Sequence, residues 1–418
     1  MQNLSQITDG LDITTKQYVD EQDADLVGIG DIKTTLGTPS NNWIECDGRK
    51  VSPAEYPKLS ELLGSYIKKI EIPGADVFYA MDVIYFKGYY LVLGEDRTYS
   101  ANPYIAVYAA PSLDGPWTRV FHPSASIRTC TAKAQFATDG NYLCFTNGGT
   151  GWHTSGQDNA YWYTTDPLGE WTKVVITHAT AQNCYYHWID YENGKFIFIG
   201  SDYQNANTGS IAFATDPTSA ANWSSHVLGN TYAHFDGEGF ARVNYHFIED
   251  SSYRTYRWFV QPGESGLLYH SADFLSSFSY IMSYVSASLS SFVFFNNKYR
   301  FGDKNERYYV YSTKLFGVAS SSGWTQVDMG KGNAPTYLME YGSKLLGFNS
   351  TKLFLSSDGV SFETIPIDFR MSGIPIALTD GSYLVAGDGN YIIAIKSPEG
   401  ASAPTITPTV GKAYIKAK

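Results

Sequence analysis

Five stretches of the chain place aromatic and histidine side chains among Asn, Gln and Asp residues, a mixture suited to binding sugars. These stretches are 95–104, 147–160, 180–188, 201–209 and 229–239. A sugar ring stacks its CH groups on a flat aromatic face while neighbouring polar groups bind its hydroxyls. The ligand-binding candidates are Tyr99, Tyr104, Trp152, His153, Tyr185, Tyr186, Tyr203, Tyr232 and His234. We expect these stretches to form long loops on one binding surface; the alternative is that individual rings pack inside the protein.

Catalytic chemistry has weaker support. A glycosidase needs two carboxylates at a defined separation, and the available pairs are Asp236 with Glu238, or Asp158 with Asp202. The sequence does not give either separation. The 8 His residues show no HxxxH or HExxH spacing and the 4 Cys residues no CxxC pair, so we expect neither a catalytic nor a structural metal. No cofactor is expected, because no Gly-rich loop opens a helix; an ion at a loop carboxylate such as Asp388 is left open.

A sequence pattern that recurs along the chain indicates the strands and turns that position these residues. An apolar strand runs into a turn rich in Asp, Pro, Gly and Ser, and an aromatic residue then opens the next strand, most clearly at 211–223. Further copies lie at 104–120, 160–175, 267–282, 308–327 and 352–365. The opening aromatic residues are Trp117, Trp171, Trp223, Phe278, Trp324 and Phe362. Their period of roughly 40–55 residues is typical of propellers and solenoids built from short strands.

Hairpin patterns alternate with these copies. They lie at 83–94, 136–146, 187–200, 246–260, 292–302, 338–348 and 376–387. The last unit lacks an outer strand, which the strand at 66–72 can supply, and such pairing closes a ring and removes exposed sheet edges. An aromatic content of 16% and 38 Gly residues also favour an all-β chain. The sequence therefore predicts a seven-bladed β-propeller at 66–400, with six or eight blades as alternatives.

Residues 28–64 carry the most specific local pattern. Strands are expected at 30–34 and 43–46, followed by a Cys-Asp-Gly turn and a helix capped by Ser52 with Pro53 at its first position. This order of motifs resembles the phage tail-collar domain. The matching residues are Gly30, Asp31, Ile32, Lys33, Trp43, Cys46, Asp47, Gly48, Ser52, Tyr56, Leu59, Leu63 and Gly64. The chain departs from the collar pattern at 68–74, where KKIEIPG stands in place of a Pro-Asp-Leu-Arg-Gly segment.

The C-terminal residues 411–418 resemble the closing strand of tail-collar and tail-fibre proteins. The two resemblances imply that the propeller is inserted into one small α+β collar-like domain made of 27–65 and 401–418, with 397–409 as the linker back. A short helix is expected in the polar segment 1–26, either as a solvated leader or as an attachment and oligomerisation segment. Its TKQYVDE stretch resembles segments near the N-termini of phage tail-fibre proteins.

Two turns, SLDGPW at 112–117 and SSDGVSF at 356–362, resemble the Asp-box of sialidases and related propellers. The resemblance implies that the Asp accepts backbone N–H bonds and that the aromatic residue packs between blades. We therefore expect structural roles for Asp114, Trp117, Asp166, Trp171, Asp216, Trp223 and Asp358. A sialidase would also need three Arg residues, the first in a Phe-Arg-Ile-Pro motif. The corresponding residues here are Ile70-Glu71-Ile72-Pro73, which argues against that activity.

Together these patterns predict a tail or tail-fibre receptor-binding protein of a phage or prophage, located in the virion. The collar-like domain would join it to other tail proteins as a homo-oligomer, a trimer as the tail-fibre resemblance implies. The propeller would adhere to a glycan or protein of the bacterial surface. The alternatives are a propeller glycosidase and a purely structural tail component. A net charge of −11 argues against nucleic acid binding, and no signal peptide or membrane insertion is expected.

Overall fold

The chain separates into two compact units in the computed structural model. Unit 1 comprises Met1–Lys68 and Ile395–Lys418, and unit 2 is the intervening Lys69–Ala394; the sequence places the corresponding boundaries near 66 and 400. The structure describes residues 29–35, 42–72, 78–96, 104–122, 134–146, 160–176, 184–192, 194–202, 209–227, 258–260, 269–271, 279–280, 289–303, 305–312, 325–371, 375–398, 400–408 and 412–417. The helix predicted within 1–26 lies outside these residues. None of the described helices is long and apolar enough to span a membrane.

Unit 1 is built around an antiparallel sheet that joins the two ends of the chain. The strand β32 (Lys412–Lys416) lies between β1 (Ile32–Thr35) and β2 (Trp43–Glu45), and β3 (Lys50–Val51) pairs with β31 (Ala401–Ser402). Together with α2 (Pro57–Leu62), these strands enclose one small core. Its buried members are Ile44, Cys46, Val51, Leu59, Ala403, Ala413, Ile415 and Ala417. Residues from both ends of the chain are therefore needed to complete this core.

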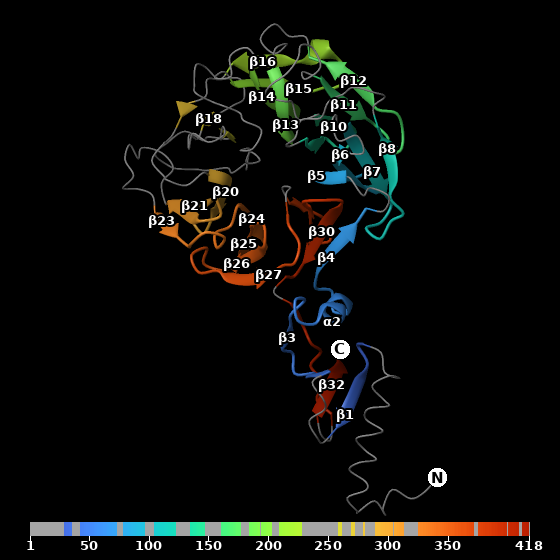
Figure 1. The fold of residues 1–418 in the computed structure, drawn as a ribbon, viewed down its shortest axis with the longest axis vertical. Helices are drawn as coiled ribbons and strands as arrows, with labels where there is room; N and C mark the ends of the chain where they lie inside the picture. The colour runs from blue at the N-terminus through green and yellow to red at the C-terminus, as the bar shows by residue number, and fades with distance from the viewer. Residues whose placement is uncertain are drawn as a thin grey trace, which may run out of the picture. The chain divides into compact units, whose positions relative to one another are not determined.

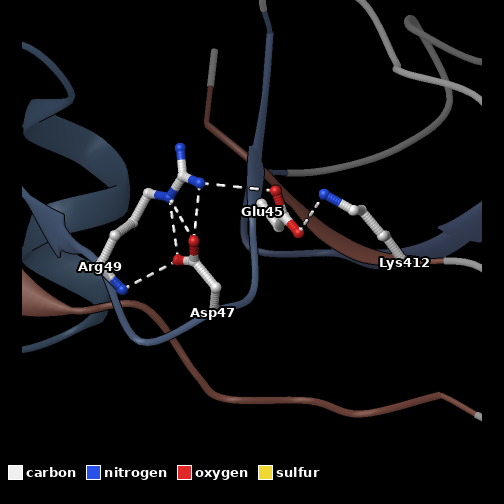
Figure 2. A network of polar contacts seen from close by, with 4 residues as sticks. All are labelled: Glu45, Asp47, Arg49 and Lys412. Atoms are coloured by element: carbon white, nitrogen blue, oxygen red, sulfur yellow. Dashed lines mark hydrogen bonds and ion pairs between the residues drawn. The ribbon is translucent and has the colours of Figure 1, made fainter.

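The Cys-Asp-Gly turn after β2 is held by charged side chains on the surface of unit 1 (Figure 2). Asp47 accepts hydrogen bonds from the backbone N–H of Arg49 at 3.0 Å and from its guanidinium at 2.6–3.0 Å. Glu45 lies between Arg49, at 3.4 Å, and Lys412 of β32, at 2.8 Å. Gly48 has a φ of +81°, and a Cβ there would lie 2.8 Å from the Thr405 hydroxyl. The turn thus needs glycine and links β2 to the C-terminal strand.

Two expectations for unit 1 are wrong in detail. The helix begins at Pro57, not at Pro53, and has no side-chain cap. The Ser52 carbonyl instead accepts hydrogen bonds from the backbone N–H groups of Glu55 and Tyr56, and these bonds form a turn before the helix. Pro57 suits the first helical turn for the same reason as Pro53, because proline has a fixed φ and no N–H to satisfy. The predicted linker at 397–409 is largely part of unit 1: β31 pairs with β3, and Ala403 is buried in the core.

Unit 2 is a β-propeller, as predicted. Its described residues form seven antiparallel sheets arranged as a ring in chain order, with the first strand of each sheet inside and the last outside (Figure 1). We number them blades 1 to 7. Blade 1 contains β5 (Phe78–Phe86), β6 (Tyr89–Asp96), β7 (Tyr104–Ala110) and β8 (Thr118–Phe121); blade 2 contains β9 (Phe136–Thr138), β10 (Leu143–Thr146), β11 (Ala160–Thr164) and β12 (Thr172–Val175); and blade 3 contains β13 (Cys184–Glu192), β14 (Lys195–Asp202), β15 (Gly209–Ala214) and β16 (Ser224–Val227). Blade 4 contains β17 (Trp258–Val260), β18 (Tyr269–Ser271) and β19 (Ser279–Tyr280), and blade 5 contains β20 (Leu289–Phe295), β21 (Lys298–Asp303), β22 (Tyr308–Ser312) and β23 (Thr325–Asp328). Blade 6 contains β24 (Tyr337–Tyr341), β25 (Lys344–Phe348), β26 (Lys352–Ser356) and β27 (Glu363–Pro366), and blade 7 contains β28 (Ile376–Ala377), β29 (Tyr383–Ala386), β30 (Tyr391–Lys396) and β4 (Tyr66–Glu71).

The ring closes through the strand that precedes blade 1. As predicted, β4 is the fourth strand of blade 7, and the Ile72 backbone N–H donates to the Asn390 carbonyl at 2.8 Å. Blades 7 and 1 are also bonded directly, because the Ala80 N–H donates to the Gly389 carbonyl at 2.8 Å. Blade 7 is therefore completed by a strand from before blade 1 and is hydrogen-bonded to blade 1. Closing a ring in this way reduces the exposed strand edges at which other chains could pair and aggregate.

Apolar side chains fill the space between neighbouring blades. One cluster joins blades 1 and 2 and includes Leu93, Phe136 and Phe145. A second joins blades 2 and 3 and includes Cys144 and Phe198, and a third joins blades 5 and 6. Because side chains alternate along a strand, Phe145 and Cys144 of β10 enter different clusters. Blade 2 is consequently buried on both faces.

Candidate functional site

Propeller topology sorts the connections between strands onto two faces. We call the end with the second-to-third-strand and blade-to-blade connections the loop face, and the end with the first-to-second and third-to-fourth connections the turn face. Tyr99, Trp152, His153, Tyr203, Tyr232 and His234 lie outside the described residues. Three further candidates were predicted in loops but begin strands at the loop face: Tyr104 opens β7, and Tyr185 and Tyr186 lie in β13, paired with Ser201 and Gly200. Aromatic residues suit strand positions, so the predicted loops at 95–104 and 180–188 are shorter than expected.

The loop face of blade 5 is organised by one fully buried carboxylate, Asp303, at the end of β21. Its oxygens accept the backbone N–H bonds of Asn305 at 3.1 Å, Arg307 at 3.1 Å and Tyr308 at 2.8 Å. These bonds fold the connection to β22 back on itself. The side chain of Arg307 then points outward to Asp328, with a guanidinium–carboxylate distance of 2.7 Å. The exposed ion pair at this face is therefore anchored by a buried acid.

In blade 6, the side chain of Asn349 similarly holds the connection after the second strand. Its side-chain oxygen accepts the N–H bonds of Thr351 and Lys352, both at 2.9 Å, and its amide donates to the Gly332 and Ala334 carbonyls of the preceding connection. The sequence signal for this arrangement is a Gly followed within two residues by Asp or Asn at the end of the second strand, a pattern not among the predictions above. It occurs as Gly94–Asp96, Gly302–Asp303, Gly347–Asn349 and Gly387–Asp388. A Cβ at Gly302 would overlap the Thr336 carbonyl, which explains the glycine.

The acidic turns lie on the turn face, and their carboxylates bond within their own turns. Asp166 accepts the Leu168 N–H at 3.0 Å, Asp216 the Thr218 N–H at 2.9 Å, and Asp358 the Val360 and Ser361 N–H groups at 2.7 and 2.8 Å. The two N–H bonds and the Ser356 hydroxyl hold the pKa of Asp358 well below its usual range. Asp114 is exposed in a turn closed by the bond from the Gly115 N–H to the Ser112 carbonyl, at 3.1 Å. Asp358, with its pKa lowered in this way, remains charged and is a poor proton donor.

The aromatic residues that follow these turns pack toward neighbouring blades to different extents. Trp223 is buried between blades 2 and 3, and its Nε1–H donates to the Tyr161 hydroxyl at 2.8 Å. Trp171 is partly buried against the cluster between blades 1 and 2, with its ring 5.0 Å from that of Phe145. Trp117 is partly buried, and its Nε1 has no hydrogen-bond partner. Trp223 and Trp171 therefore contribute to the packing between blades.

A tyrosine on the third strand of one blade bonds to the turn of the next. Tyr161 of blade 2 donates its hydroxyl hydrogen to the Pro217 carbonyl of blade 3, and Tyr309 of blade 5 donates to the Gly359 carbonyl of blade 6 at 2.8 Å. Both carbonyls belong to the residue after a turn aspartate, Asp216 or Asp358. Burial raises the pKa of Tyr309 to about 12, even though Arg300 acts in the opposite direction. We call this contact the tyrosine–turn bond.

Arg300 reinforces the tyrosine–turn bond between blades 5 and 6. Its guanidinium is fully buried and donates to the Phe295 carbonyl at 3.0 Å, the Tyr309 hydroxyl at 2.9 Å, the Asp358 carbonyl at 3.0 Å and the Gly359 carbonyl. A guanidinium with its donors occupied in this way is not exposed to bind a substrate carboxylate. Asp388 lies 3.8 Å from Arg370 at the surface. Within the described residues, no group of three His, Cys, Asp or Glu side chains is placed to hold a metal.

Comparison with known proteins supports the fold and gives no family. The sequence matches no family model and no curated protein. Among solved structures, virginiamycin B lyase from Staphylococcus aureus is similar, with a TM-score of 0.53, 13% identity, and coverage of 79% of this chain and 98% of the lyase. YCF48 from Cyanidioschyzon merolae has a TM-score of 0.52 at 9% identity, covering 79% and 98%. The WD40 β-propeller domain of Doa1 has a TM-score of 0.50 at 10% identity, covering 80% and 97%. At such low identities the likeness concerns the β-propeller alone.

The contact between Gly359 and Arg300 predicts an unequal effect of two glycine substitutions. Gly359 has a φ of +67°, and a Cβ there would overlap the Arg300 guanidinium, whereas Gly381, with a φ of +78°, has open space around it. Gly381→Ala should lower the free energy of unfolding by about 1 kcal/mol through backbone strain alone. Gly359→Ala should lower it by about 3 kcal/mol or more, because a buried charge loses its partners. Urea unfolding of both variants tests this, and equal losses would contradict the contact.

The raised pKa of Tyr309 predicts a sensitivity to alkali. The folded state favours the neutral phenol, so the stability that it contributes is complete below pH ~10 and is lost as pH rises toward 12. A difference of this size corresponds to about 2–3 kcal/mol. Tyr309→Phe should lower stability by about 1 kcal/mol at pH 7, yet flatten the decline between pH 10 and 12. Denaturant unfolding against pH measures this, with Tyr308→Phe on the same strand as the control; parallel wild-type and Tyr309→Phe profiles would contradict it.

Proposed function

We propose that this protein is a receptor-binding component of a phage or prophage tail or tail fibre. Unit 1 joins it to other tail proteins as a homo-oligomer, in the trimeric state implied by the tail-fibre resemblance. Unit 2 binds a glycan or protein of the bacterial surface through its loop face. Weak binding at each copy becomes firm adhesion when many copies on one particle engage together. The protein acts in the virion and needs neither a cofactor nor nucleic acid.

The observation that carries this proposal is where the collar-like residues lie. Cys46 and Leu59 from the first segment pack in one core with Ala413 and Ile415 from the C-terminal segment. The C-terminal strand β32 pairs with both β1 and β2. Motifs that resemble a tail-collar domain at opposite ends of the sequence thus form one small unit, with a propeller between them. An attachment module that carries a large ring is the arrangement of an adhesion protein.

The glycosidase alternative has less support in the part of the chain that the structure describes. The carboxylates of Asp166, Asp216 and Asp358 are bonded within turns, and Arg300 is enclosed between blades. Asp303 is buried and bonded to three N–H groups. Each of these groups makes contacts that stabilise the fold, so we propose that the propeller binds its ligand without cleaving it. The experiment below separates the two.

Adsorption to host cells tests the binding role. The full-length variant Trp152→Ala with Tyr186→Ala should lose at least about tenfold in cell binding, because it removes two rings that the sequence predicts to stack on a sugar. Lys331→Ala with Asn333→Ala, exposed on the loop face of the late blades, is the matched control. Circular dichroism checks that the variants are folded. Unchanged adsorption of the first variant would remove that site, and release of shortened saccharides by the wild type would favour the glycosidase.

Disruption of the unit 1 sheet tests the attachment role. Ile415 is 4% exposed in the core and faces Ile32 and Ile44 across the sheet. Ile415→Asp buries an unpaired charge and should unfold unit 1 while unit 2 keeps its cooperative melting transition. We expect loss of the oligomer by light scattering and retention of glycan or cell binding by the monomer. Lys412→Ala, on the same strand but exposed, should leave the oligomer intact. An Ile415→Asp protein that still assembles would contradict the role of unit 1.

A further inference from the structure

Tyrosines gather on the turn face of unit 2, the face opposite to the loops considered so far. Among the described tyrosines within three residues of a turn-face connection, Tyr108 and Tyr299 are buried, and nine others are exposed or partly exposed. These nine are Tyr85, Tyr89, Tyr90, Tyr142, Tyr163, Tyr191, Tyr311, Tyr341 and Tyr383. We call this set the tyrosine collar. The sequence predicts only structural turns on this face.

The collar consists of ring contacts within and between blades. In blade 1, the centroids of Tyr85 and Tyr90 lie 4.8 Å apart. Tyr142 and Tyr163 of blade 2 lie 6.0 Å apart and pack with Tyr191 of blade 3 against one apolar cluster. Tyr341 of blade 6 and Tyr383 of blade 7 lie 5.3 Å apart, and the Tyr383 hydroxyl donates to the Glu340 carbonyl at 3.2 Å.

The contacts place the rings on the inner side of the propeller. Tyr85, Tyr191 and Tyr341 come from β5, β13 and β24, which are first strands and lie inside the ring (Figure 1). Their partners come from second and third strands, one step further out. The tyrosine groups in blade 1, between blades 2 and 3, and between blades 6 and 7 therefore follow the inner margin of the turn face.

Packing alone does not account for the collar. The same hairpins bury Phe86, Phe196 and Leu384 completely or nearly so, and these residues supply the apolar contacts between blades. The tyrosines instead leave ring surface in contact with water, as much as 47% of the side chain for Tyr85. Clustered and ordered aromatic surface of this kind marks a binding site more often than scattered apolar residues do. Because the rings contact each other, little freedom is lost when a ligand arrives.

We propose that the tyrosine collar binds a chain of neutral sugars. Each tyrosine offers a flat face for sugar CH groups and a hydroxyl for hydrogen bonding, and exposed Asn141, Asn297 and Glu340 beside the rings add polar partners. Lys87 does not offer a free cation, because its ammonium donates to the Asn141 and Thr165 carbonyls at 3.1 and 2.7 Å. Asp139, Glu340 and Asp380 lie at these hairpins together with Lys195, Lys298 and Lys344, so the charges of this face are mixed and favour a neutral sugar over a strongly charged one.

A chain-like ligand fits better than a single sugar. The tyrosine groups lie in different blades, so one small molecule cannot reach all of them, whereas an extended saccharide can contact several in succession. Weak contacts along one chain combine through effective concentration. This second surface is separate from the loop face, and would let one propeller hold a polysaccharide while the loop face engages another part of the cell surface.

A glycan array probed with the full-length protein tests the collar. The probes are neutral and anionic bacterial saccharides of several lengths, with wild type, the collar variant Tyr85→Ala/Tyr142→Ala/Tyr341→Ala, and the loop-face variant Trp152→Ala/Tyr186→Ala. We expect wild type and the loop-face variant to bind longer neutral saccharides, and the collar variant to bind them at least about tenfold more weakly. The corresponding triple Phe variant keeps the rings and should retain most of the binding. Val360→Ala, exposed on the same face, is the matched control.

The outcomes separate this inference from the proposed function. Neutral-glycan binding that survives in the collar variant overturns the collar and leaves the receptor-binding role intact. Loss of cell adsorption only in the loop-face variant, with glycan binding lost only in the collar variant, supports both. Absence of wild-type binding to every neutral saccharide overturns the collar even if the protein adsorbs to cells. Protection of Tyr85 from nitration by a bound glycan, read by mass spectrometry, gives a direct readout that does not depend on a variant's stability.

Discussion

The requirement that governs this structure is the burial of both faces of each blade. Alternate side chains of a strand such as β10 enter different apolar clusters, one shared with blade 1 and one with blade 3. A sheet of this kind exposes apolar surface unless it has a neighbour on each side, and the only arrangement of a short row of sheets that gives every member two neighbours is a closed ring. Closure then needs a strand to complete the last blade, and β4 supplies it from before blade 1.

Polar groups between the blades follow from that closure. Where two blades meet, backbone carbonyls of the turns would be buried without partners, and an unpaired buried polar group is costly. Tyr161 and Tyr309 supply donors to the turn carbonyls at two junctions, and Arg300 fills the remaining space at the second. The acids of the turns bond to their own backbone. Asp358 and Arg300 are thus charged residues that act in holding the ring together.

The two rims differ in chemistry. On the loop face of the late blades, Asp303 and Asn349 fold the connections tightly and leave an ionic surface that includes Arg307 and Asp328. The turn face presents tyrosines, and three pairs of them are in ring contact, Tyr85 with Tyr90, Tyr142 with Tyr163, and Tyr341 with Tyr383. The ring thus presents two dissimilar surfaces among its described residues, and each is built on the ends of packed strands.

The sequence by itself determined the features that depend on short-range pattern. Alternating strands, acidic turns and hairpin signals predict an all-β ring, and the missing outer strand of the last unit predicts closure by 66–72, which is β4 in the structure. Only tertiary packing decided the rest. Pro53 and Pro57 are equally suited to begin a helix, and the packing of Leu59 in the core accompanies the later start. The pattern of strands does not reveal that Arg300 is buried, because its carbonyl partners lie in another blade. Tyr341 and Tyr383 are likewise in contact because they lie in neighbouring blades. Local sequence determines to which side of its strand a side chain points, whereas the packing of the blades in the ring determines which residues that side chain contacts.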